Sequence, residues 1–138
     1  MSSQRNTTSR QLRLVDSTDV ARLLSPELCA QLVRDALEAA ARDHAELAPR
    51  VVAAWPNSDG VVAALQAALP DRRGFRAKIV CVMPNNAKHG LSSHVGVVVL
   101  HEPVHGQPIA IVDGTSITRL RTAAISAVAV ETLARHGA

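Results

Sequence analysis

The feature that most constrains the fold of this chain is a run of six apolar residues at positions 95–100, which reads VGVVVL. Consecutive β-branched residues favour a strand, and a strand without a polar face has to be covered on both sides. The sequence therefore predicts a central strand at 94–101, covered by a helix on one face and by a partner subunit on the other.

Five further segments predict the rest of the sheet. Each is rich in apolar and β-branched residues, and most are separated by clusters of Pro, Gly, Asn and Asp. The short connections favour antiparallel pairing, so we expect a mixed, largely antiparallel sheet of about six strands. The segments lie at 12–15, 51–55, 61–69, 75–82 and 109–113.

Two helices are predicted before most of the sheet. Asp16 or Ser17 can cap a short helix, and Ser25 followed by Pro26 is a second helix start signal. From 26 to about 44 apolar residues recur at helical spacing, and we expect this stripe to lie on the sheet. The stripe consists of Leu28, Leu32, Ala36, Ala39 and Ala40.

A longer helix is predicted at 116–135, with Glu131 and Arg135 paired across one turn. The expected fold class is thus α+β, with the sheet flanked by the N-terminal helix pair and the long C-terminal helix. A chain of 138 residues with 47% hydrophobic content can bury one core. We place that domain at residues 12–138, behind a flexible polar tail at 1–11.

Composition excludes several classes of protein. The basic residues behind the net charge of +3 are scattered, and Trp55 and Phe75 are the only aromatics, so the sequence does not predict nucleic-acid binding. No apolar stretch is long enough to cross a membrane and no signal peptide is recognisable, which predicts a cytoplasmic protein.

The cysteines and histidines do not suggest a metal or redox centre. Cys29 and Cys81 sit in apolar settings without a C-x-x-C motif, as expected of buried thiols in a reducing compartment. His94 and His101 are an odd number of residues apart on one predicted strand and would point to opposite faces. No metal site is therefore predicted.

The segment 113–124 is the first candidate site, because a strand ends there and the long helix begins. We place Arg119 and Arg121 in the first turn of the predicted helix, where free N–H groups and the positive end of the helix dipole disfavour cations. An anionic ligand would resolve this conflict, so the sequence predicts an anion site.

Lys78 and Arg50 are further candidates. Alternation places Lys78 on the same face as Val80 and Val82, where loss of hydration would lower its pKa and suit it to proton transfer or to pairing with a buried anion. The alternative is an edge-strand lysine that reaches solvent. Together with Arg121, these cations could converge on one carboxylate or phosphate.

Four sequence blocks carry a resemblance to a known family. They read KIVCVMPNN at 78–86, GLSSHVG at 90–96, GQPIAIVDG at 106–114 and TRLRTAA at 118–124. With these blocks in this order, the region 50–135 resembles the ornithine cyclodeaminase/mu-crystallin family.

The resemblance implies a substrate-binding and dimerisation domain that is followed, in the family, by a Rossmann domain holding NAD or NADP. The sequence ends where that domain would begin, so we expect the Rossmann domain to be absent here or supplied in cis or in trans. By resemblance, Arg50, Lys78 and Arg121 hold the substrate carboxylate, and Lys78 assists proton movement at the amine or imine. Arg121 and Ser93 would approach the nicotinamide.

The resulting hypothesis is the N-terminal portion of an NAD(P)-dependent enzyme that acts on the α-carbon of an amino or imino acid, as a homodimer. A cyclodeaminase, an imine reductase and an amino-acid dehydrogenase all fit. No carboxylate occurs between positions 61 and 69 to hold a distal amine, which argues against ornithine as substrate. No tight cofactor binding is expected of this chain alone. The alternatives are a stand-alone binding or dimerisation module and a non-functional fragment.

Overall fold

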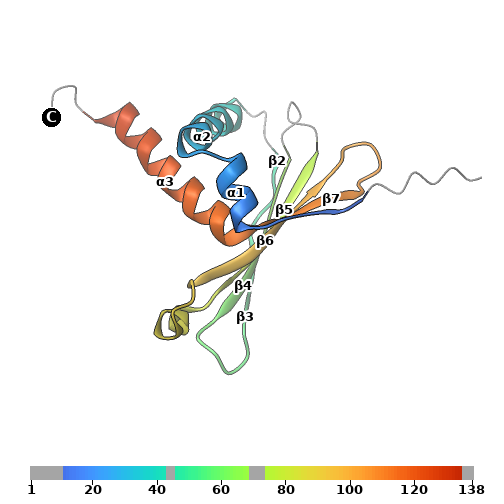
Figure 1. Ribbon diagram of the computed structural model, residues 1–138, viewed down its shortest axis with the longest axis vertical. Helices are drawn as coiled ribbons and strands as arrows, with labels where there is room; N and C mark the ends of the chain where they lie inside the picture. Colours follow the sequence, from blue (N-terminus) through green and yellow to red (C-terminus); the bar gives the residue numbers. More distant parts are fainter. Residues whose placement is uncertain (1–10, 43–45, 69–73, 135–138) are drawn as a thin grey trace, which may run out of the picture.

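The computed structural model describes residues 11–42, 46–68 and 74–134. Three predicted features lie outside these ranges: the tail up to residue 10, most of the turn at 70–74, and Arg135 as the partner of Glu131. The described strands and helices form a single sheet with three helices gathered at one side of it (Figure 1).

The described strands form one sheet in the order β1-β7-β6-β5-β4-β2, with β3 also paired to β4. All neighbours run antiparallel except β1 and β7, which are parallel. The α+β class and the mixed, largely antiparallel sheet are therefore confirmed. The strands are β1 (Arg13–Val15), β2 (Glu46–Leu47), β3 (Val51–Ala54), β4 (Val61–Ala68), β5 (Phe75–Val82), β6 (His94–His101) and β7 (Pro108–Asp113).

The strand predictions hold closely, and β5 and β6 have the predicted bounds. The sequence does not predict β2, because two residues carry no periodic pattern, and β2 raises the sheet to seven strands. The connection between β5 and β6 contains a 3₁₀ helix, Pro84–His89, where the sequence predicts only a turn.

The first two helices begin at their predicted caps. In α1 (Ser17–Leu23), the Asp16 carboxylate accepts a hydrogen bond from the Asp19 N–H at 2.9 Å. In α2 (Pro26–Ala41), the Ser25 hydroxyl accepts from the Leu28 N–H at 3.2 Å. These short polar side chains satisfy N–H groups that have no partner within the helix.

The prediction that α2 lies on the sheet is wrong, because α2 packs mainly against α3 (Gly114–Leu133). Cys29 is its buried residue, whereas Leu28 and Leu32 are 42% and 36% exposed, so the contacting face is rotated by one position from the predicted stripe. Small side chains on both helices let them approach closely, and Arg34 of α2 forms an ion pair with Glu131 of α3.

The helix α3 covers one face of the sheet through an unusually close backbone contact. A Cβ atom added to Gly114 would lie 2.7 Å from the carbonyl carbon and oxygen of Gly96 on β6. Only glycine allows this approach, and it seats the start of α3 directly on the sheet. The buried residues of the described strands include Ala63 of β4, Val80 of β5 and Ala110 of β7.

The central position of β6 is confirmed, since it lies between β5 and β7 with α3 against it. Its other face is not covered in the described structure. Val95 and Val97 are 44% and 39% exposed there, beside Ile79 of β5 at 47%. We call the face that contains these three residues the open sheet face. Cover by a partner subunit stays a prediction.

The hairpin between β6 and β7 is held by a buried carboxylate. Glu102, which is 6% exposed, accepts hydrogen bonds from the backbone N–H groups of Val104, His105 and Gln107 at 2.8, 2.7 and 3.2 Å. These bonds, led by that from Val104, hold the pKa of Glu102 below its ordinary value.

The cysteines agree with the predicted thiols: both are free, Cys29 is buried and Cys81 is half-buried. Burial raises the pKa of Cys29. Within the described part of the chain, no helix has the length and hydrophobicity needed to cross a bilayer.

Candidate functional site

A cavity of about 660 Å³ lies between α3 and the covered face of the sheet. Arg50, Lys78 and Arg121 all line it, although they come from the segment before β3, from β5 and from α3. The structure thus brings the three predicted cations to one space, while their binding of a common anion stays a prediction. None of the described residues that line the cavity is acidic.

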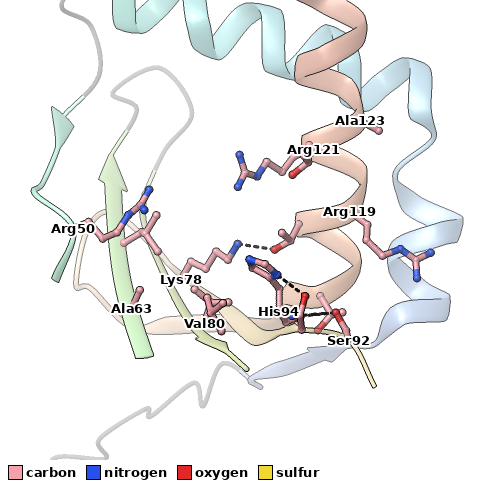
Figure 2. Close-up of a pocket in the computed structure, with 15 residues that line it drawn as sticks. Arg50, Ala63, Lys78, Val80, Ser92, His94, Arg119, Arg121 and Ala123 are labelled. Carbon is pink, nitrogen blue, oxygen red and sulfur yellow. Dashed lines mark hydrogen bonds between the residues drawn. The ribbon is translucent and has the colours of Figure 1, made fainter. Parts of the chain in front are cut away.

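Lys78 projects from the floor of the cavity toward α3 (Figure 2). Its Nζ donates a hydrogen bond to Thr118 Oγ1 at 2.6 Å. As predicted, Lys78 shares a face with Val80 and Val82, which also line the cavity. The lysine is half-buried and does not lie at the edge of the sheet, because β5 is flanked by β4 and β6.

The pKa of Lys78 is lowered from its ordinary value. Burial is the main cause, since it removes water from the ammonium group, and the positive charges of Arg121 and Arg50 add to it. The cavity thus holds three cations close enough to repel one another. Arg50 and Arg121 are exposed, so water screens part of this repulsion, and an anion bound between the cations would relieve the rest.

Antiparallel pairing positions these residues. Lys78 pairs with Leu65 on β4, and Val51 of β3 pairs with Ala64, so Arg50 lies beside the same row of the sheet. Arg121 enters from above because α3 is seated on β6. In Figure 2, the side chains of Arg50, Lys78 and Arg121 extend into the space between β4, β5 and α3.

The helix-terminus argument for the anion site is wrong. The helix begins at Gly114, because Asp113 caps it by accepting from the Ser116 N–H at 2.7 Å. Arg119 and Arg121 are therefore its sixth and eighth residues, beyond the first turn to which the dipole effect is confined. The prediction of an anion site therefore depends on the three cations that line the cavity and not on the helix end.

Arg119 differs from Arg121 in direction. Although part of Arg119 lines the cavity, its guanidinium points away from Lys78, to the other side of α3 (Figure 2). The side chains of residues two apart on a helix do not share a face, which explains the difference. Arg119 also lines a second, smaller cavity between α2 and α3.

Polar residues at the start of β6 form one wall of the cavity. Ser93, the predicted nicotinamide contact, is half-buried, and its Oγ lies 3.0 Å from His94 Nδ1. The Ser92 hydroxyl donates to the His94 carbonyl at 3.0 Å and accepts from the His94 N–H at 3.2 Å. These bonds fix the backbone where the strand enters the sheet.

Thr118 and His94 line the cavity, although neither is predicted as part of the anion site. Thr118 precedes Arg121 by three positions, and this spacing, which puts both on one helix face, is the sequence signal that indicates it. His94 enters the sequence argument only as a possible metal ligand. Across the described ranges, no group of three or more His, Cys, Asp or Glu side chains is arranged to hold a metal.

Comparison with known proteins gives a family-level match. The family model of the ornithine cyclodeaminase/mu-crystallin family matches residues 10–138. A Delta(1)-pyrroline-2-carboxylate reductase of Bacillus cereus is 43% identical over 61 residues, which cover 44% of this chain and 19% of that protein. The iminosuccinate reductase of Paracoccus denitrificans is 32% identical over 132 residues, which cover 91% of this chain and 39% of the relative.

Solved structures give the same result. The Delta(1)-pyrroline-2-carboxylate reductase of Thermococcus litoralis, in complex with NADH and L-proline, superposes with a TM-score of 0.86 at 30% identity, over 90% of this chain and 38% of that one. An archaeal alanine dehydrogenase dimer with bound NAD gives 0.83 at 28% identity, over 91% and 38%. The chain thus spans well under half the length of these relatives.

Proposed function

Because the chain belongs to the ornithine cyclodeaminase/mu-crystallin family, we propose that it is the substrate-binding portion of an NAD(P)-dependent enzyme of imine or amino-acid metabolism. The substrate is an α-amino or α-imino acid, and its carboxylate binds between Arg50, Lys78 and Arg121. The reaction is hydride transfer at the α-carbon, as in an imine reductase or an amino-acid dehydrogenase.

The convergence of three cations on one cavity is the observation that carries this proposal. Each comes from a different element, and the described lining offers no acidic side chain to neutralise them. A carboxylate placed among them relieves their mutual repulsion and accepts charge-assisted hydrogen bonds. The two arginines are suited to a planar, forked carboxylate, whereas the lysine acts as a point charge.

Lys78 has a second role in the proposal. Its lowered pKa brings the ammonium closer to the range in which it can give up or take back a proton. A lysine that binds the carboxylate stands near the α-carbon, and therefore also near the amine or imine nitrogen. Lys78 would assist proton movement at that nitrogen.

The described residues fit only one end of a dinucleotide. Ser93 and Arg121 line the cavity where a nicotinamide ring could approach the substrate. The chain has no G-x-G-x-x-G turn to bind the pyrophosphate. The cofactor supplies the hydride when it is bound. We therefore expect no tight binding of NADH or NADPH to this chain alone, and no turnover without a nucleotide-binding domain.

The lining also bears on substrate class. Leu65 of β4 faces the cavity, and β4 carries no acidic residue. A substrate with a distal ammonium group, such as ornithine, would bury that charge without an acidic partner among the described lining residues, which costs free energy. We therefore favour small α-amino or α-imino acids without a second amine.

Pairing of two chains through the open sheet face is the proposed assembly. Ile79, Val95 and Val97 expose an apolar strip there, and a strip of this kind favours association. The dimeric archaeal alanine dehydrogenase provides a precedent among the relatives.

Ligand-dependent thermal unfolding of the 138-residue chain tests the carboxylate site. We expect L-proline and sulfate each to raise the melting temperature, because a ligand that binds only the folded state stabilises it by mass action. Arg121→Ala should abolish the increase. Arg42→Ala removes the same charge from an exposed site on the C-terminal end of α2 and should leave the increase intact.

Two results would contradict the proposal. One is a melting temperature that rises equally in wild type and Arg121→Ala, which would indicate general salt stabilisation. The other is a micromolar dissociation constant for NADH or NADPH, because the cofactor site would then lie largely within this chain.

A further inference from the structure

We propose that Thr118 is a positioning residue. Its hydroxyl holds the Lys78 ammonium at one place in the cavity and directs it toward the ligand carboxylate. This inference rests on the proposed function, because it concerns the same cavity. Thr118 itself need not touch the ligand.

The hydrogen-bond directions around Thr118 carry the argument. Its Oγ1 lies 2.6 Å from the Gly114 carbonyl oxygen, which can only accept, so the hydroxyl proton points there. The lone pairs of Oγ1 are then left to accept from Lys78 Nζ, also at 2.6 Å. Because the hydroxyl donates to the Gly114 carbonyl within α3, it can only accept a hydrogen bond from the lysine.

The hydrogen bond between Thr118 and Lys78 joins two elements that are far apart in the sequence. Thr118 and Lys78 are 40 positions apart, and their bond links α3 to β5. A lysine side chain is a flexible chain of four carbons, and its ammonium group would sample many positions without a fixed partner. Since Arg121 lies one turn beyond Thr118 on the same helix face, the bond also sets the spacing between the ammonium and the guanidinium.

The same bond counteracts the repulsion in the cavity. Among the described residues, the charged and titratable groups that line the cavity with Lys78 are Arg50 before β3, His94 on β6, and Arg119 and Arg121 on α3, while β4 contributes none. The Arg119 guanidinium points away from the lysine (Figure 2). Against these groups, the Thr118 oxygen is a described partner that favours the charged form of the lysine. Loss of this acceptor should make the ammonium easier to deprotonate.

A titration of the lysine side chains in the free protein tests this directly. The chain has only two lysines, so an NMR spectrum that observes the lysine ε-carbon has two signals, one from each residue. The Lys88 signal is the internal reference. We expect Thr118→Val to lower the titration midpoint of Lys78. Thr118→Ser keeps the hydroxyl and should restore it. If Thr118→Val does not fold, Thr118→Ala removes the same acceptor in a residue that favours helix.

Thr132→Val is the matched control. Thr132 lies on the same helix and makes the same kind of back-bond, to the Val128 carbonyl at 2.7 Å, without a lysine partner. A Lys78 midpoint that is unchanged in Thr118→Val, or changed equally in Thr132→Val, would overturn the inference.

Affinity for L-proline provides a second readout. We expect Thr118→Val to weaken binding about tenfold, the effect of losing one hydrogen bond to a charged group, and to move the alkaline loss of binding to lower pH. A wild-type chain that binds neither L-proline nor sulfate would sink the proposed function. The lysine titration would still decide the role of Thr118, because it needs no ligand.

Discussion

Gly114→Ala tests whether the contact between α3 and β6 sets the geometry of the site. The added methyl carbon would lie 2.7 Å from the carbonyl carbon and oxygen of Gly96 and 2.8 Å from the backbone nitrogen of Val97. All three are backbone atoms of a central strand and cannot rotate away. The start of α3 would have to recede by about 0.7 Å to reach an ordinary contact of 3.4 Å.

Two effects of opposite sign determine the stability of this variant. Overpacking against rigid backbone costs about 2–3 kcal/mol. Replacing glycine by alanine in a helix gains up to about 1 kcal/mol, and less at its first position. The clash should therefore destabilise the variant by a net amount of about 1–3 kcal/mol, which lowers the melting temperature of a domain of this size by roughly 5 °C or more.

Thermal unfolding followed by circular dichroism is the assay, with Ser126→Ala as the control. Ser126 is exposed on the same helix, so its replacement by alanine should change the stability by less than about 0.5 kcal/mol. L-proline binding should also weaken in Gly114→Ala, since receding of α3 lengthens the bond between Thr118 and Lys78. A melting temperature equal to or above that of wild type would refute the close contact.

Two further predictions concern the β6–β7 hairpin and the open sheet face. Glu102→Gln should lower the melting temperature at pH 7, because the carboxylate accepts three backbone N–H bonds. The lowered pKa of Glu102 means that its stabilising effect is complete above its ordinary pKa of 4.5 and is lost as the pH falls through the folded-state value. The difference from wild type should therefore shrink on acidification, and a constant difference in a pH series of melts would contradict this. Val97→Lys should prevent self-association, because it buries a charge in the proposed interface, whereas Leu133→Lys replaces another exposed apolar residue, at 80% exposure, outside that face. Analytical ultracentrifugation measures both variants, and a wild type that stays monomeric at high concentration would contradict the proposed dimer.

Most of the secondary structure could be predicted from local sequence. The strands β5 and β6 follow from β-branched runs bounded by turn residues. The helices α1 and α2 begin directly after Asp16 and Ser25, because these short polar side chains cap free N–H groups. These preferences act over a few residues, so the sequence shows them directly.

Packing between elements could be predicted only in part. The sequence predicts the wrong contact face of α2, because the side with Leu28 and Leu32 is the more hydrophobic one. Close approach to the alanine-rich α3 instead favours the side with Cys29. The two-residue strand β2 has no local pattern at all. In each case the deciding contact is with a distant segment.

For the candidate site, the sequence by itself determined the chemical types and the shared face: Arg50, Lys78 and Arg121 are cations, and alternation places Lys78 on one face with Val80 and Val82. Only the tertiary structure decided that the three share one cavity, and that Thr118 accepts the Lys78 bond. It also moved the start of α3 to Gly114, which removed the helix end from the anion site. The physical reason is that side-chain type and alternation are local properties, whereas convergence depends on how closely α3 can approach β6.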